Sequence, residues 1–220
     1  MLTFQKFVDL SLPLNASTPI YPGDPEPHFS VATTLEQDGY NLFNVNIGSQ
    51  SGSHVDAPYH FNNDGGTVDQ VALSQCFGNG LVIDVTHKNS MEAIEVIDIE
   101  PFAEQISRVD IVLFRTDWDQ HIGTEAFFEH PFLSEQGAIY LLQLGIKTVA
   151  IDTINLDKTG GTEFPVHTLF AARGGLIAEN LCNFRAIDFD NPLISLLPLN
   201  LSGCDGSPVR AVAIQCTRQS

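Results

Sequence analysis

Three short apolar runs constrain the fold of this chain more than any other feature. They span residues 80–85, 110–115 and 148–152, and the last two are rich in β-branched residues. Continuous apolar runs of this length are typical of strands that are buried on both faces, as in parallel sheets. Between the last two runs, residues 134–144 have helical spacing and are followed by Gly145, which predicts a helix that ends there. This βαβ-like order predicts a mixed α/β fold with parallel, buried strands.

Other segments extend this framework toward both ends of the chain. Helical spacing predicts a helix at 94–108, opened by Asp98 with Pro101 in its first turn, and another from Pro165 to Gly174. Because no repeat, low-complexity tract or linker interrupts the sequence, we expect one domain over residues 1–220. Strands are predicted at 4–12, 29–33, 40–47 (alternating, with one apolar face) and 209–215, and a short helical turn at 68–73.

The charge balance excludes several classes of partner. The formal net charge is −17, from 27 acidic and 10 basic residues, so the chain repels phosphate backbones and anionic membrane surfaces. The sequence shows neither a signal-peptide pattern nor an apolar stretch of the roughly 18 residues that span a bilayer. The four cysteines form no CxxC pair, which predicts reduced and mostly buried thiols. We therefore expect a cytoplasmic protein that binds neither nucleic acid nor membranes.

The segment from Gln50 to His60, Gln-Ser-Gly-Ser-His-Val-Asp-Ala-Pro-Tyr-His, is dense in metal-binding side chains. In an extended chain, Gln50, His54 and Asp56 project to the same side. An imidazole and a carboxylate that converge in this way can begin a site for zinc or manganese. Pro58 prevents regular strand pairing, so we expect the chain to bend and to bring His60 near the same ion. On spacing alone, a hydrogen-bonded loop is the more common alternative.

A second pair of residues lies far along the chain. His167 and Glu179 are separated by Gly174-Gly175, so they do not share one helix, but they can meet if the chain reverses at the glycines. Taken alone, His167 is more typical of a hydrogen-bonded core histidine, and Glu179 of a solvated turn.

Polar residues also follow two of the buried strands. The segments 115–118 and 152–157 begin where the apolar runs end, and such positions often line a site in α/β folds. A capped loop that only continues the chain explains them equally well. The remaining histidines stand in polar or loop contexts and are predicted to face solvent: His28, His87, His121 and His130.

These separated pieces, in this order, resemble the cyclase family, which includes bacterial kynurenine formamidases, isatin hydrolases and a group of dienelactone hydrolases. The family pattern His-x-Gly-Thr-His-x-Asp-x-Pro-x-His corresponds to residues 50–60, with Gln50 in place of the first His and Ser53 in place of Thr. Further matches are Tyr21-Pro-Gly-Asp24, Leu113-Phe-Arg-Thr-Asp117, Asp152-Thr-Ile-Asn-Leu-Asp157, His167 followed by Glu179, and the ending from Gly203 to Ala213. The resemblance therefore covers nearly the whole chain.

The resemblance implies a swivelling β/β/α arrangement and assembly into homodimers or homotetramers. The formamidases of this family carry two zinc ions. Carried over to this sequence, the family's roles fall on His54 as a ligand of one ion, Asp56 as a bridging carboxylate, His167 as a ligand of the second ion, Glu179 as a second bridging carboxylate, His60 as the proton-transferring residue, and Tyr21 in the place of a substrate-contacting Trp.

Two departures from the family pattern bear on the chemistry. The amide of Gln50 is a weaker ligand than imidazole, so one metal position is weak or empty, or manganese is preferred to zinc because it accepts oxygen donors readily. One or two divalent ions per chain are therefore expected. Tyr21 in place of Trp leaves the identity of the substrate open.

The expected function is metal-dependent hydrolysis of an amide or lactone bond in a small, arylformamide-like metabolite. In that scheme a divalent ion lowers the pKa of bound water from 15.7 toward about 7, and the resulting hydroxide attacks the carbonyl. His60 takes and returns the proton, a duty that an unperturbed imidazole pKa of about 6.5 suits. Two alternatives remain: a catalytically silent protein that binds a small ligand, and a metal-dependent lyase or cyclising enzyme that uses the same site.

Overall fold

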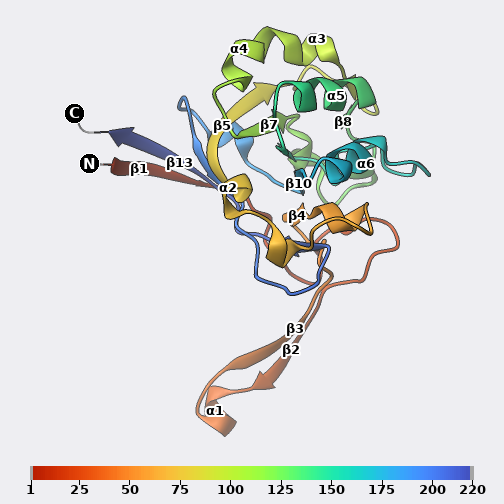
Figure 1. The fold of residues 1–220 in the computed structure, drawn as a ribbon. Coiled ribbons are helices and arrows are strands. Elements are labelled where there is room, and N and C mark those ends of the chain that lie inside the picture. The colour runs from red at the N-terminus through yellow and green to blue at the C-terminus, as the bar shows by residue number, and fades with distance from the viewer. Residues whose placement is uncertain (1, 219–220) are drawn as a thin grey trace.

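A nine-stranded mixed sheet organises the computed structural model, which describes residues 2–218 (Figure 1). The strand order is β1-β13-β11-β5-β7-β9-β10-β4-β12. The four central strands are parallel, which confirms the predicted mixed α/β class with a buried parallel core. They are β5 (Phe77–Asp84), β7 (Ile111–Arg115), β9 (Thr148–Ile151) and β10 (Leu176–Glu179).

The outer strands of this sheet are antiparallel to their neighbours. On one side of the parallel core, β1 (Leu2–Asp9), β13 (Val212–Arg218) and β11 (Leu193–Ser195) follow one another. On the other side, β4 (His54–Asp56) pairs with both β10 and β12 (Gly206–Pro208). The sequence from His54 to Asp56 therefore lies inside the sheet, flanked by two segments from the second half of the chain.

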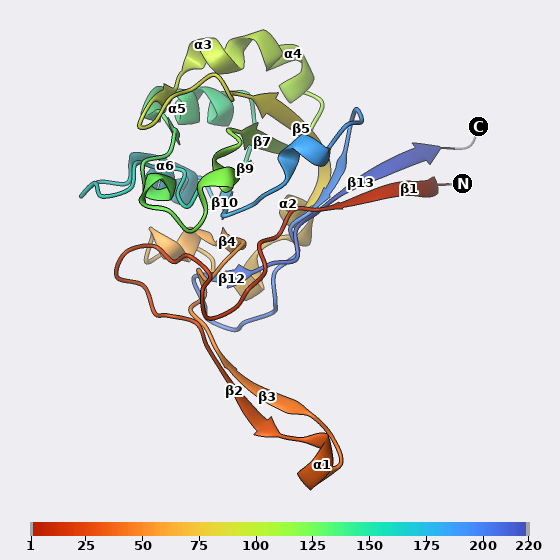
Figure 2. The ribbon, with the colours of Figure 1, turned by 180° about the vertical axis from the view of Figure 1, so that it is seen from behind.

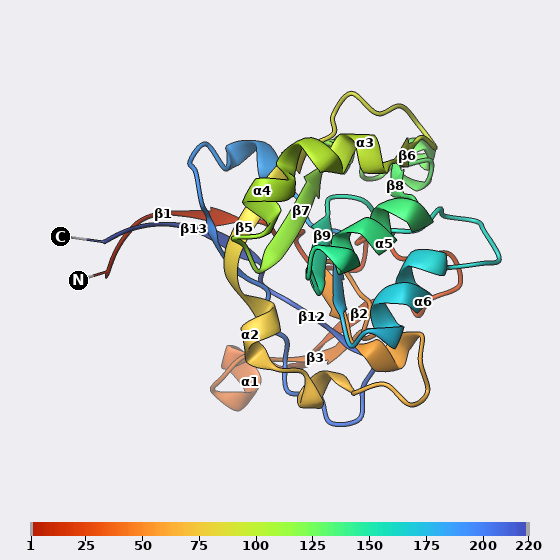
Figure 3. The same cartoon turned by 45° about the horizontal axis from the view of Figure 1, so that its top comes forward.

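Helices cover one face of the parallel strands, as Figures 1 and 3 show. Alternation along each strand divides the core, because Val112 and Phe114 pack against the helices while Ile111 and Leu113 pack against loops and outer strands. The predicted helix that ends at Gly145 is confirmed, with Ser134 capping its first turn. The covering helices are α3 (Val96–Ile99), α4 (Ala103–Ile106), α5 (Glu135–Gln143) and α6 (Pro165–Ala172).

The prediction of one continuous helix over 94–108 is wrong, because the structure divides this segment into several short elements. A short strand ends at Ile94, and α3 begins after a capping box that Glu95 and Asp98 form. A 3-10 turn at Glu100–Phe102 then separates α3 from α4. Pro101 has no backbone N–H to continue the α-helical hydrogen bonds, which explains the break.

A hairpin arm extends from the body of the molecule (Figures 1 and 2). It consists of β2 (His28–Thr33) and β3 (Leu42–Asn46), with α1 (Leu35–Asp38) at the tip. The predicted alternation of β3 is present, but its apolar face is not buried: Phe43 is 57% exposed and Val45 is 54% exposed. The arm therefore offers apolar surface to contacts outside the body of the chain.

Short elements complete the described chain. The strand pair β6 (Ala93–Ile94) and β8 (Phe132–Leu133) is parallel, and α2 (Leu73–Cys76) precedes β5. Among residues 2–218, no helix is long and apolar enough to cross a membrane. The 3-10 turns span Pro58–His60, Val68–Gln70, Glu100–Phe102, Trp118–His121, Glu125–Phe128 and Phe184–Ala186.

Two burial predictions are corrected. His130 does not face solvent; it is fully buried, and its ring nitrogens lie 2.7 Å from the Pro131 carbonyl oxygen and 2.7 Å from Thr159 Oγ1. The cysteines are free, but only Cys76 among the four is buried, and the other three are partly exposed.

Candidate metal centre

Sheet pairing brings the two predicted clusters together. Within β4, His54 and Asp56 are two residues apart and so point to the same side. The antiparallel register of β4 with β10 sets Glu179 directly opposite His54. The chain reverses between α6 and β10 at Gly174, whose φ of +65° lies in the left-handed region, so His167 returns to the same place. His167 and Glu179, which the sequence allowed to meet, are therefore in contact.

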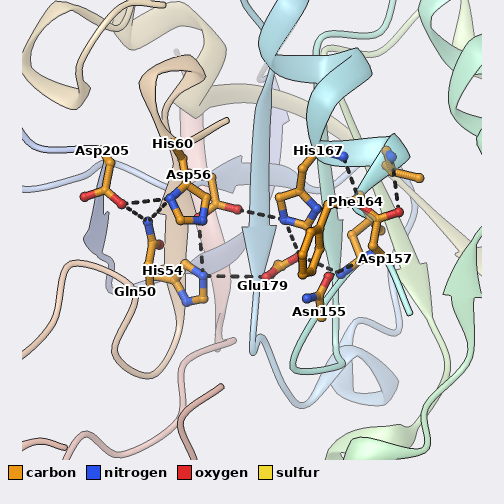
Figure 4. A network of polar contacts seen from close by, with 12 residues as sticks. Gln50, His54, Asp56, His60, Asn155, Asp157, Phe164, His167, Glu179 and Asp205 are labelled. Carbon is orange, nitrogen blue, oxygen red and sulfur yellow. Dashed lines mark hydrogen bonds and ion pairs between the residues drawn. The ribbon is translucent and has the colours of Figure 1, made fainter. Parts of the chain in front are cut away.

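The four side chains form a symmetrical arrangement, and all are at most 4% exposed. His54 Nε2 lies 3.4 Å from Asp56 Oδ1 and 3.7 Å from Glu179 Oε2. His167 Nε2 lies 3.3 Å from Asp56 Oδ2 and 3.2 Å from Glu179 Oε1. Figure 4 shows the Glu179 carboxylate between the two imidazole rings. Each imidazole thus faces one oxygen of each carboxylate, and each carboxylate directs its two oxygens at different imidazoles.

Hydrogen bonds at Nδ1 fix the orientation of both rings. His54 Nδ1 lies 2.7 Å from the Gly52 carbonyl oxygen, and His167 Nδ1 lies 2.7 Å from Asp157 Oδ2. Because a carbonyl and a carboxylate can only accept, each Nδ1 donates a hydrogen and each Nε2 is directed at the carboxylates. A hydrogen bond donated by Nδ1 to a carbonyl or carboxylate is typical of histidines that bind metals through Nε2.

The donor set fits divalent cations. Both oxygens of Asp56 are buried and make no well-formed hydrogen bond within residues 2–218; the polar atoms that face them are the imidazole Nε2 atoms of His54 and His167. Buried carboxylates in proteins are paired with charges or coordinate metals. His54, Asp56 and Glu179 each offer a ligand atom, and these atoms lie within 4.8 Å of one another. Imidazole and carboxylate ligands suit zinc and manganese.

The same carboxylates change the protonation of the imidazoles in the metal-free protein. Burial alone would lower the pKa of His54, but Asp56 and Glu179 outweigh burial and raise this pKa to about 10. The pKa of His167 is also raised, because Glu179 and Asp157 outweigh the opposing effect of burial. In the absence of metal, protons therefore occupy the Nε2 atoms that a cation would contact.

Metal binding should consequently release protons. Below pH 10 the metal-free imidazole of His54 is protonated, so an incoming ion must displace that proton, and affinity should rise about tenfold per pH unit for each proton displaced. Calorimetric titration with Zn²⁺ in two buffers of different ionisation enthalpy counts the released protons. We expect at least one per ion. Binding without proton release would show that the ion enters elsewhere.

Beside this centre, His60 and Gln50 both contact Asp205, a residue that the sequence analysis did not single out. His60 follows β4 in the 3-10 turn opened by Pro58, which confirms the expected bend. His60 Nδ1 lies 2.8 Å from Asp205 Oδ2, and Gln50 Nε2 donates to the same oxygen at 2.8 Å. The His60 hydrogen bond, opposed by burial, holds the pKa of Asp205 well below its usual range.

Gln50 does not reach the site in the predicted way. The strand begins only at His54, and Gly52, at φ +67°, turns the chain between them, so Gln50 does not lie on an extended face shared with His54 and Asp56. It approaches from the turn instead. Its Oε1 is buried, and within the described chain it has no hydrogen-bond partner.

A cavity of about 190 Å³ opens in front of these residues. Tyr21, Phe61 and Phe164 line it with aromatic surface, and Asn155 adds a polar edge. Asn155 Oδ1 accepts a hydrogen bond of 2.7 Å from the Asp157 backbone N–H, which directs its Nδ2 away from that contact (Figure 4). The resemblance to the family points to Tyr21 here, but not to Phe164.

The polar residues after the buried strands divide into two groups. Asp157 orients His167 and caps α6 by accepting from two of its backbone N–H groups, and Asn155 lines the cavity. Asp152 instead accepts hydrogen bonds from Thr116 and from the Asp117 backbone N–H. Burial raises the pKa of Asp152 to about 7 against these hydrogen bonds. The segment 115–118 therefore supports the strand ends, and not the metal centre.

Close packing beneath Gln50 makes Gly206 sensitive to substitution. A Cβ at Gly206 would lie 2.6 Å from both Gln50 Nε2 and the Val55 carbonyl oxygen, so Gly206→Ala should lower the unfolding free energy by about 1–3 kcal/mol. Gly66→Ala is the matched control, because the nearest atom to its added Cβ would be 3.8 Å away. Urea unfolding compares the two variants, and equal stability would refute the packing argument.

Comparison with known proteins assigns the family. The cyclase family profile matches residues 8–158. The kynurenine formamidase of Bacillus cytotoxicus is 34% identical over 209 residues, which cover 94% of this chain and 96% of that protein. Isatin hydrolase A from Labrenzia aggregata, solved with benzyl benzoate, has the same fold, with a TM-score of 0.86 at 21% identity over 95% of this chain and 93% of that one.

A third relative is a Bacillus stearothermophilus structure described as a predicted metal-dependent hydrolase. It aligns with a TM-score of 0.75 at 25% identity, over 97% of this chain and 98% of that one. The profile covers more than half of the chain, and the formamidase matches almost its whole length. The chain therefore belongs to the cyclase family.

Proposed function

We propose that this protein is a metal-dependent hydrolase that cleaves an amide or lactone bond of a small aromatic metabolite. The paired arrangement of His54, Asp56, His167 and Glu179 at the floor of an aromatic-walled cavity carries the proposal. Similarity to kynurenine formamidases and isatin hydrolases supports the same class of reaction.

The ligand roles follow from which atoms face each other. His54 would hold one ion and His167 another, and Asp56 and Glu179 would each offer one oxygen to the His54 side and the other oxygen to the His167 side. Oε1 of Gln50, which is buried and lacks a hydrogen-bond donor within residues 2–218, is the proposed weak ligand on the His54 side. When bound, zinc or manganese ions supply Lewis-acid chemistry, polarising a carbonyl and acidifying water.

His60 is the proposed proton-transferring residue. It lines the cavity, and its Nδ1 contacts Asp205, whereas the Nε2 atoms of His54 and His167 face the central carboxylates. We therefore place His60 at the edge of the centre and outside the ligand set. Burial lowers its pKa, but the hydrogen bond to Asp205 outweighs burial and raises it above the usual value. A partly exposed imidazole of this kind can accept a proton and return it to a leaving amine.

Aromatic walls would position the substrate and exclude water. Phe61 packs 5.3 Å from Phe164 and 4.6 Å from His167, between ring centroids. The Tyr21 ring meets the Phe164 ring edge-on, with their centroids 6.2 Å apart. A flat aromatic substrate fits such walls. Homodimeric or homotetrameric assembly is also proposed, and the exposed apolar residues of the β2–β3 arm are its proposed contact surface.

Removing the metal tests the function. Thorough chelation should abolish hydrolysis of an aryl formamide and an aryl lactone, and Zn²⁺ or Mn²⁺ should restore it, because the attacking water depends on the ion. Full activity after chelation, with no metal found by elemental analysis, would refute the proposal. Bound metal without turnover of either substrate would favour a ligand-binding protein, and products without net addition of water would favour a lyase.

A further inference from the structure

Asp205 accepts three hydrogen bonds at the edge of the metal centre. It stands immediately before β12 and is 145 residues from His60 in the sequence. Ser49 Oγ donates to Oδ1 at 2.7 Å, while Gln50 Nε2 and His60 Nδ1 each lie 2.8 Å from Oδ2. Figure 4 shows the carboxylate facing both Gln50 and His60.

The 2.8 Å contact with Asp205, which is shorter than the 3.4 Å between His60 Nδ1 and Gln50 Nε2, determines which nitrogen of His60 carries a hydrogen. A carboxylate can only accept, so a neutral His60 donates from Nδ1, and Nε2 is left as the nitrogen that can accept a proton. The edge of the Phe61 ring, with its centroid 4.7 Å from that of His60, limits rotation of the imidazole. Asp205 Oδ2 can only accept, so Gln50 must direct its amide nitrogen toward it. The amide oxygen, Oε1, therefore points away from Asp205.

We propose that Asp205 is a positioning residue, which holds His60 with Nδ1 protonated and Nε2 free for proton transfer and keeps Gln50 Oε1 directed away from the carboxylate. This inference rests on the proposed hydrolysis. Asp205 would act through His60: it does not line the aromatic-walled cavity, whereas His60 lines both that cavity and an adjoining one of about 210 Å³ that Asp205 borders. The competing explanation is a purely structural role, a clamp, in which the hydrogen bonds of Asp205 only hold the turn at 48–51 against β12.

The test compares Asp205→Asn with Ser49→Ala in the full-length, metal-loaded protein. Asn keeps the shape of the side chain but can offer an N–H to His60 Nδ1, which favours the other tautomer. We expect kcat to fall about 10–10²-fold, with KM and metal content unchanged. Ser49→Ala removes a hydrogen bond to the same carboxylate without touching His60, so its kcat should stay within about twofold of wild type.

The tautomer is read directly by ¹⁵N NMR of the histidine side chains at alkaline pH, with His60→Ala to assign the signal. The wild-type His60 should show a protonated Nδ1, and Asp205→Asn should lose that signature. An Nε2-protonated ring in the wild type, or an unchanged spectrum and kcat in Asp205→Asn, would overturn the proposal. Equal losses in Ser49→Ala and Asp205→Asn would also overturn it, in favour of the clamp.

This readout also separates two failures. If the wild-type protein hydrolyses neither an aryl formamide nor an aryl lactone, the proposed function fails. The tautomer of His60 and its dependence on Asp205 would still be decided by the spectra. If the Asp205→Asn variant does not fold, the wild-type spectrum alone decides the proposal. The proposal then requires that the wild-type His60 carry a proton on Nδ1.

Discussion

Replacement of Asp56 by Asn should remove bound metal and lower hydrolysis by about 10³-fold or more, the largest single effect that we expect. Asp56 gives one oxygen to the His54 side of the centre and the other to the His167 side. An amide keeps only one strong acceptor and loses the negative charge that both positions share. Elemental analysis of the purified variant, together with initial rates on an aryl formamide, measures both effects.

Asp64→Asn is the matched control for this variant, because it makes the same chemical change at an exposed position. It should retain wild-type metal content and rates. If Asp56→Asn instead kept its metal and lost only turnover, Asp56 would take part in catalysis without being needed to hold the ion. Retention of both metal and turnover would contradict the bridging role.

Replacement of His60 by Ala should separate catalysis from metal binding. Because His60 is proposed to stand outside the ligand set, metal content should remain near that of the wild type, while turnover falls by about 10²-fold or more through loss of proton transfer. Metal analysis and kcat on the same preparation give the answer. The exposed His87 provides the control, since His87→Ala also deletes an imidazole but at a residue that does not line the cavity.

Two outcomes would change the role of His60. Unchanged turnover in His60→Ala would show that the proton moves by another route. Loss of metal in parallel with turnover would place His60 among the ligands. Its Nδ1 contact with Asp205 would then be the hydrogen bond that orients a metal-binding histidine.

The sequence predicts well those parts of the fold and site that depend on local pattern. Continuous apolar runs at 110–115 and 148–152 specify buried parallel strands, and these are β7 and β9. The alternation of His54 and Asp56, followed by the bend at Pro58, places two candidate ligands on one face. Glycines 174 and 175 allow the reversal that returns His167 to Glu179, but no local pattern specifies that the reversal ends there.

Other features depend on contacts that no local pattern records. Asp205 is one acidic residue among 27, and it reaches His60 only because β12 pairs with β4. His130 follows a glutamate and precedes a proline, a context that suggests a surface loop, yet contacts with Pro131 and Thr159 satisfy both ring nitrogens in the interior. The turn at Gly52 likewise changes how Gln50 approaches without changing the residue pattern.

The swivelling β/β/α arrangement, the cytoplasmic location and the oligomeric state remain predictions from family resemblance and composition. The mixed sheet is shared with isatin hydrolase A, which supports a common fold. The identity of the metal is likewise a prediction, and Gln50 is the residue on which it depends most. Zinc and manganese differ in how readily they accept its amide oxygen.

The most direct test of the metal centre is anomalous X-ray scattering from crystals grown with Zn²⁺ or Mn²⁺. We expect a peak about 2.0–2.2 Å from His54 Nε2 and from oxygens of Asp56 and Glu179, with any second peak beside His167. A contrary result would be a peak only at another acidic group, such as Asp117, Asp119 and Asp152, or none at all while crystals of the same protein remain active.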